Sequence, residues 1–260
     1  MNQEPLDILP IWLLFVLILA IAGFSLEAGY RYGLRRHRRS ADEQVTPVGA
    51  IVGSILGLFA FLLAFTFGMA ANRFDDRRQA VLNEANAIGT TYLRTRLLPE
   101  PQRGTSARFL REYAEVRIQG VQTRHVPESV KRSEELHELL WADAVQAAEK
   151  QPGPITGLYI QSLNDTIDMH EVRLQAGLRS RIPMSIWVCL LSLSVLSMAS
   201  VGYQAGLSAT RRSPAMVALA LAFASVMYLI ADLDRGHEGF LQVSQDAMVD
   251  VQKSMRAEPK

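Results

Sequence analysis

The amino-acid sequence predicts an all-α membrane protein with four transmembrane helices and a helical extramembrane domain between spans two and three. Two observations support this prediction. Four long apolar stretches, 8–26, 45–72, 182–210 and 213–231, contain no charged residue, and the segments outside them are rich in charge and carry apolar residues at helical spacing. Lipid offers the backbone no hydrogen-bond partners, so we expect each apolar stretch to be a helix whose bonds lie within the segment.

The lengths of the apolar stretches fit a bilayer, because about 20 helical residues cross about 30 Å of hydrocarbon. The first stretch is preceded by Glu4 and Asp7 but by no base, whereas a secretory signal peptide carries positive charge there. We therefore expect a retained span. The predicted spans are 8–28, 48–71, 183–205 and 213–231. The predicted domains are a first transmembrane hairpin (1–72), the extramembrane domain (73–181), a second hairpin (182–231) and a C-terminal tail (232–260).

Basic residues gather in the two short loops that join the spans. The second of these loops carries Arg211 and Arg212. Because base-rich short loops stay in the cytoplasm, the charge pattern predicts a multi-pass protein of a bacterial inner (plasma) membrane with its polar domain in the periplasm. Opposing bases such as Arg73 and Arg181 border a long segment, and long segments translocate with little regard to charge. The bases of the first loop are Arg31, Arg35, Arg36, Arg38 and Arg39.

The polar segment is predicted to be a set of helices. Apolar residues recur at helical intervals over 74–92 and 160–178, and breaks near Pro99, Pro127 and Pro152 separate the pieces. We expect the first of these helices to continue directly from span two, and the last to continue directly into span three.

Span two carries an unusual run of glycines. Gly49, Gly53 and Gly57 form two overlapping small-xxx-small repeats, and such residues let helix backbones approach closely in lipid. One interpretation is therefore a packing seam between helices.

The same four-residue step continues through Phe61 and Phe65 and reaches Arg73. The alternative interpretation is a line of pore residues. In that case Phe61 and Phe65 form a hydrophobic constriction that gates by dewetting, and Arg73 is a base that favours anions near one end.

No motif predicts an enzyme active site or a site for a cofactor or metal. Asp165, Asp168 and Glu171 share one helical face, where we expect solvated acids rather than ligands of a cation. The net charge of +1 gives no basic field for nucleic acid, and Cys189, the single cysteine, lies in an apolar run. An acidic cluster after span four matches no EF-hand spacing. Its members are Asp232, Asp234, His237 and Glu238.

Glu84 lies among polar residues on the helix that follows span two. We expect it to have a structural role, bonding across to the helix before span three with Arg173 as its partner. Ion binding is the alternative.

Three separated segments resemble the bestrophin-like family of prokaryotic membrane proteins. They are Leu63–Arg94 (LAFTFGMAANRFDDRRQAVLNEANAIGTTYLR), Asn164–Arg173 (NDTIDMHEVR) and Asp232–Gln252 (DLDRGHEGFLQVSQDAMVDVQ). They occur in the family's order, and the resemblance covers nearly the whole chain. The chain departs from the pattern at Gly236-His237, where the family has proline followed by an aromatic residue.

The family is distantly similar to bestrophins, which are pentameric anion channels. The resemblance therefore implies a homo-oligomer, with a pentamer as the model, in a lipid bilayer, passing small anions. It places the neck of the pore on Gly57, Phe61 and Phe65, although Gly57 stands where a bulky residue is expected. It also implies a cytosolic polar domain, opposite to the side that the charge pattern predicts.

Two functions follow from these observations. The first is a homo-oligomeric anion channel in which span two lines the pore. The second is a non-conducting membrane protein whose helical domain binds or senses a partner. Conductance of the purified protein separates the two.

Overall fold

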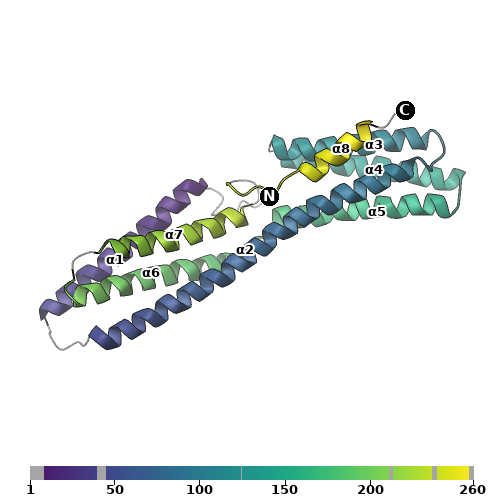
Figure 1. Ribbon diagram of the computed structural model, residues 1–260. Coiled ribbons are helices and arrows are strands. Elements are labelled where there is room, and N and C mark those ends of the chain that lie inside the picture. The colour runs from purple at the N-terminus through teal and green to yellow at the C-terminus, as the bar shows by residue number, and fades with distance from the viewer. Residues whose placement is uncertain (1–8, 40–44, 124, 211–212, 236–238, 258–260) are drawn as a thin grey trace. The chain divides into compact units, whose positions relative to one another are not determined.

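The computed structural model describes residues 9–39, 45–123, 125–210, 213–235 and 239–257, and the regular elements in these ranges are all helical (Figure 1). The all-α prediction is thereby confirmed. The expectations that concern Glu4, Asp7, Arg211, Arg212, Gly236, His237 and Glu238 lie outside the described residues. The elements are α1 (Ile11–Arg39), α2 (Val45–Thr95), α3 (Gln102–Gln122), α4 (Val126–Lys150), α5 (Pro154–Leu174), a π-helical turn (Gln175–Arg179), α6 (Met184–Leu207), α7 (Pro214–Asp234) and α8 (Asp246–Ala257).

The structure confirms the four predicted spans. Four helical segments within the described residues are long and apolar enough to cross a membrane. They contain α1, α2, α6 and α7. Two of the helices are longer than the apolar stretches that they contain, since α1 continues to Arg39 and α2 to Thr95. The extramembrane helices α3 and α4 lie between spans two and three, as the sequence predicts.

The expected direct continuation into span three is wrong. The π-helical turn ends at Arg179, and residues 180–183 are not helical. Pro183 explains the break, because proline has no N–H to donate and disfavours helical geometry in the residue before it. The N–H of Ile182 instead donates to Asp234 Oδ1 at 2.9 Å. The other expected continuation is present, since α2 runs unbroken out of span two.

The chain forms two compact units. Unit 1 contains Met1–Phe74 and Arg181–Gln242, and unit 2 contains Asp75–Ser180 and Val243–Lys260. Unit 1 therefore holds α1, the first part of α2, α6 and α7, and unit 2 holds the rest of α2 with α3, α4, α5 and α8 (Figure 1).

In unit 1, α1 and α6 run in the same direction with their backbones in contact. A Cβ added to Gly29 would lie 2.0 Å from the carbonyl oxygen of Ala199, and one added to Gly202 would lie 2.0 Å from that of Leu26. Gly33 and Gly206 meet the partner helix's backbone just as closely. These four glycines, which we call the α1–α6 seam, form one GxxxG pair on each helix and allow the close approach.

Aromatic and aliphatic side chains fill the rest of unit 1. The Phe59 ring of α2 lies 4.7 Å from the Phe223 ring of α7, centroid to centroid. Leu63, Leu190 and Met227 are buried in the same cluster. The buried face of α2 in this unit is therefore its Phe59–Leu63 side.

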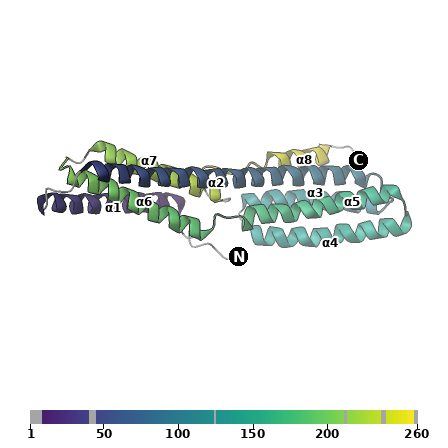
Figure 2. The same cartoon turned by 90° about the horizontal axis from the view of Figure 1, so that it is seen from below.

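In unit 2, α8 closes a helical core. Figure 2 shows α8 alongside the latter part of α2. Met248 and Met255 of α8 are buried with Ile88, and the Tyr92 hydroxyl donates to the Met255 carbonyl at 3.0 Å. The strong apolar stripe of this short helix is thus covered by residues far away in sequence.

The α1–α6 seam predicts a contrast between two glycines of the same helix. Gly29→Ala forces a methyl group against backbone, and overpacking of this kind costs about 1–3 kcal/mol. Gly23→Ala is the matched control, because a Cβ at Gly23 meets nothing within 4 Å. We expect the thermal midpoint in detergent to fall for Gly29→Ala and to stay equal or rise for Gly23→Ala. Equal midpoints would contradict the close helix contact.

Candidate functional site

The predicted constriction residues lie on one face of α2 that unit 1 leaves uncovered. Phe61 is 69% exposed and Phe65 is 60% exposed, and Gly57 is exposed on the same face. The opposite face carries the buried Phe59 and Leu63. We call the uncovered side, which also includes Gly53, Ser54, Leu58, Ala60 and Ala64, the open face of α2.

Among the described residues, nothing packs closely against two glycines of the open face. A Cβ added to Gly53 or Gly57 would meet nothing within 4 Å. Gly49 differs, because a Cβ there would lie 2.9 Å from Nε2 of Gln204 on α6. Packing at Gly53 and Gly57 thus stays a prediction that requires a second chain, since small residues in a span mark sites of close helix approach.

The glycine seam within the chain lies elsewhere. It uses the GxxxG pairs of α1 and α6, which were not singled out from the sequence. The available signal was the spacing Gly29-xxx-Gly33 and Gly202-xxx-Gly206, identical to the spacing in span two. Spacing alone does not reveal which of several glycine pairs face each other inside one chain.

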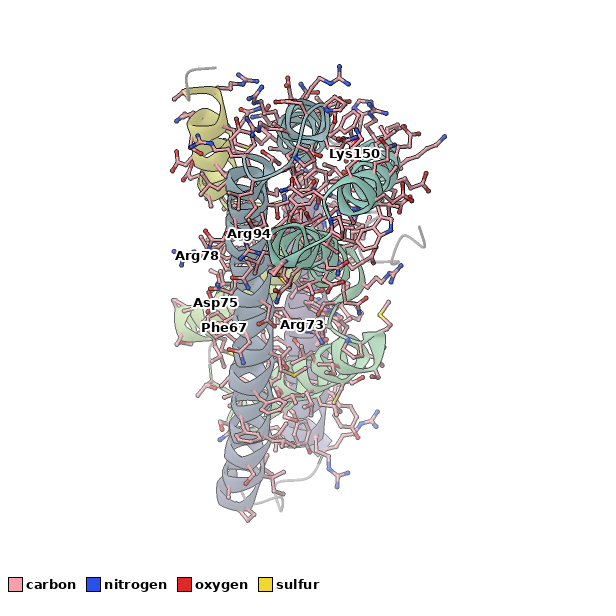
Figure 3. The ribbon with its side chains drawn as sticks, turned by 90° about the vertical axis from the view of Figure 1, so that its right-hand side faces the viewer. Phe67, Arg73, Asp75, Arg78, Arg94 and Lys150 are labelled. Carbon is pink, nitrogen blue, oxygen red and sulfur yellow. The ribbon has the colours of Figure 1, made fainter. Side chains whose placement is uncertain are left out.

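Arg73 is turned away from the open face and toward the end of α7. Its Nη1 lies 3.8 Å from Asp234 Oδ1, and its side chain is 20% exposed. Figure 3 labels Arg73 and Phe67, which leave α2 on different sides. Arg181 lies 3.8 Å from the same carboxylate and donates to the Asp234 carbonyl at 2.6 Å. The role of Arg73 toward a permeating ion stays a prediction, beside this observed ion pair.

The acidic residues after span four are engaged by protein donors. Asp232 accepts the N–H groups of Phe240 and Leu241 at 3.0 and 3.2 Å. Arg235 ties the same region to the start of the chain by donating to the Leu9 carbonyl at 2.7 Å. Asp232 and Asp234 therefore have a structural role at the end of α7, where they bind backbone N–H groups and arginines. No group of three or more metal-ligating side chains is present among the described residues.

The polar core of unit 2 is built around Glu84, which is fully buried. Arg173 of α5 donates to its Oε2, which confirms the predicted pair. Arg117 Nε of α3 lies 2.9 Å from Glu84 Oε1, and the Tyr113 hydroxyl donates to the same oxygen at 2.6 Å. One carboxylate thus joins α2, α3 and α5.

Two histidines complete this polar core. The ring centroids of His137 and His170 are 4.9 Å apart, and His170 Nδ1 lies 3.1 Å from the Tyr113 hydroxyl. Because the Tyr113 proton goes to Glu84, we assign a proton to His170 Nδ1, which then donates to the tyrosine oxygen. Arg173 also donates to Oε1 of Gln245, the residue just before α8, at 2.7 Å.

Electrostatics fix the charge states in this core. Burial raises the pKa of Glu84, but the charges of Arg173 and Arg117 and the Tyr113 hydrogen bond outweigh it, so the pKa lies below its ordinary value. Burial, helped by Arg117, lowers the pKa of His137 to about 4 and that of His170 to about 3. At neutral pH the core therefore holds two arginines, one carboxylate and two neutral imidazoles.

The predicted acidic face of α5 is solvated. Asp165, Asp168 and Glu171 are exposed, while the adjacent His170 points into the core. Arg173 is not available to this face, because it is paired with Glu84. Arg78 of α2, which Figure 3 labels, is an exposed base of unit 2, unlike Arg173.

Removing the Glu84 charge should strongly destabilise unit 2. Glu84→Gln leaves two buried guanidinium groups without a carboxylate, and breaking a buried pair typically costs about 3–5 kcal/mol. Glu112→Gln is the matched control, because the Glu112–Arg132 pair is 39% and 41% exposed and surface pairs contribute at most about 1 kcal/mol. Circular-dichroism melting of both variants in detergent checks this difference.

Acid should destabilise unit 2 in two steps. The folded histidines bind protons more weakly than the unfolded ones, so their contribution to stability is complete above about pH 6.5 and is lost as the pH falls toward about 4 and about 3. Glu84, with its lowered pKa, adds a loss below its ordinary pKa. His137→Gln should flatten the fall in melting temperature between pH 7 and pH 5 by removing one titrating group. An unchanged slope would contradict the buried neutral imidazole.

Comparisons with known proteins agree with this architecture. The Bestrophin-like domain family matches residues 16–248. Two structures of single-residue variants of a bacterial bestrophin homolog from Klebsiella pneumoniae superpose with TM-scores of 0.69 and 0.66 at 14% identity, covering 95% of this chain and 99% and 97% of theirs. A structure of the homolog phased with zinc gives a TM-score of 0.64 at 14% identity, covering 94% of this chain and 97% of that chain. No curated protein matches the chain.

The structural similarity at this identity establishes the fold, and the family match extends over most of the chain. The resemblance inferred from the three sequence segments is confirmed. This multi-pass membrane protein belongs to the bestrophin-like family.

Proposed function

We propose that the protein is a homo-oligomeric channel for small anions in which α2 of each chain lines a central pore. The observation that supports this most directly is the open face of α2, where Phe61 and Phe65 are exposed beside several small residues. A single span per chain cannot enclose a pore, so the proposal requires several copies around one axis. The similarity to bestrophins suggests five.

Small residues distinguish the open face from a surface that meets only lipid. A lipid-facing helix gains from large apolar side chains, whereas Gly53, Gly57 and Ala64 offer little apolar area. In a ring of copies, such positions widen the pore or let neighbouring helices approach. The open face thus fits a protein-lined environment better than an acyl-chain environment.

Phe61 and Phe65 supply the proposed gate. Repeated around a symmetry axis, they form two apolar rings one helical turn apart, and such rings close a pore by excluding water. Gly57, one turn before Phe61, makes a wider layer. Arg73 enters the proposal as a base near one end of the pore rather than on its wall, because in the single chain it pairs with Asp234 and is turned away from the open face.

Chloride flux tests the channel. The purified protein in liposomes should pass chloride above the rate of empty vesicles, and Phe61→Ala with Phe65→Ala should raise the flux several-fold by widening the constriction. Phe24→Ala is the matched control, because Phe24 is 77% exposed on α1 and is not on the open face. If Phe24→Ala changed the chloride flux as much as the double variant does, the proposal that Phe61 and Phe65 form the gate would be wrong.

The second function is a non-conducting membrane protein whose helical domain binds a partner. Trp141 and Val145 on α4 of unit 2 favour it, because both are at least 40% exposed on a helix outside the spans. An intact oligomer that carries no current above empty vesicles would exclude the channel and leave this function.

The side of the membrane that holds unit 2 is a separate prediction. The charge pattern predicts the periplasm, and the similarity to bestrophins suggests the cytosol. A reporter inserted between α3 and α4, where residues 123–125 join the helices, distinguishes the two. Alkaline phosphatase activity indicates the periplasm, and fluorescence of a cytosolic reporter indicates the opposite side.

A further inference from the structure

The last part of α1 carries an exposed basic surface. It consists of Arg35, Arg36, Arg38 and Arg39, all exposed, and we call it the α1 basic surface. Residues 31–43 contain five arginines and two acids, which gives this segment of the sequence a formal charge of +3. The surface lies within unit 1 and takes no part in the open face of α2.

The register of the α1–α6 seam places this surface relative to the bilayer. A Cβ on Gly33 would lie 3.0 Å from the N of Leu207, the last residue of α6. The six residues from Leu34 to Arg39 therefore extend past the end of α6, by about 9 Å at the helical rise. The headgroup layers add about 10–15 Å to a core of about 30 Å, so this extension spans one headgroup layer.

Tyrosines mark the same membrane level. The Tyr32 and Tyr203 rings lie 5.6 Å apart, and the Tyr30 hydroxyl donates to the Thr210 carbonyl at 3.1 Å. Tyrosines gather where hydrocarbon meets headgroups. The α1 basic surface begins within one turn beyond them, at the depth of the lipid phosphates.

The arginines at the two ends of the spans differ in their protein partners. Arg73 and Arg181 are held by Asp234, and Arg235 is bound to a backbone carbonyl. At the other end, Arg31 pairs with Glu27 at 2.7 Å. Arg35, Arg38 and Arg39, by contrast, make no ion pair or hydrogen bond in the part of the chain that the structure describes.

We propose that the α1 basic surface binds the phosphate groups of anionic phospholipids in the leaflet where α1 ends. Each guanidinium presents paired donors that match phosphate oxygens, and clustered bases at a span end attract anionic headgroups. The helix dipole also favours bases here, but its effect is confined to the last turn, and Arg35 lies before that turn. The proposal does not depend on ion conduction.

Native mass spectrometry of the full chain in detergent tests the proposal, with phosphatidylglycerol as the anionic probe and phosphatidylcholine as the neutral one. The unmodified protein should retain more phosphatidylglycerol, and this preference should fall steeply with salt. Inorganic phosphate at the same concentration should not compete, which separates a membrane lipid from a soluble anion. Equal retention of the two lipids would overturn the proposal.

The variant with Arg35→Gln, Arg38→Gln and Arg39→Gln locates the site. Each base contributes about fivefold to binding, so the preference should drop on the order of a hundredfold. The control removes three exposed bases of unit 2 with Arg103→Gln, Lys131→Gln and Lys253→Gln, and should retain the preference. Equal losses in both variants would overturn the assignment to α1. If the first variant fails to fold, single substitutions ranked against the control decide the outcome.

Discussion

Lipid imposes two demands on unit 1, and most of its structure meets one or the other. Backbone groups must bond within each span, which makes α1, the first part of α2, α6 and α7 helical. Lipid also removes the hydrophobic drive between helices, so they associate through shape and close contact. The α1–α6 seam meets the second demand with four glycines, and the parallel register that it fixes determines which residues reach beyond the hydrocarbon.

Charge is organised differently in the two units. Unit 2 buries one carboxylate with two guanidinium groups and two neutral imidazoles, and this arrangement joins three helices and Gln245, which precedes α8. A packing that left this carboxylate buried without its guanidinium partners would cost about 3–5 kcal/mol. Unit 1 uses its charges at the ends of spans, where Asp234 holds Arg73 and Arg181.

The sequence predicted the parts of the fold that depend on local pattern. Uncharged stretches located the spans, proline located several breaks, and the Glu84–Arg173 pair followed from polar positions on two helices. It did not predict what depends on contact between distant segments. Arg117 and Tyr113 of α3 meet Glu84 of α2, and His137 of α4 lies against the Tyr113 ring, but their own positions in the sequence carry no distinguishing motif. The glycine contact between α1 and α6 was not singled out for the same reason, since the glycine pairs of α1, α2 and α6 share one spacing.

The docking of α8 has a consequence for how the chain is made. Tyr92 and Met255 touch although 163 positions separate them, and all of α6 and α7 lies between. A ribosome must therefore deliver the last span to the translocon before the core of unit 2 can be sealed, because domains complete only when their chain has emerged. During that interval the apolar residues clustered with Met248 and Met255, Ile88 among them, lack the cover of α8. The nascent protein is thus most vulnerable to aggregation and proteolysis late in synthesis, after its membrane helices are already inserted.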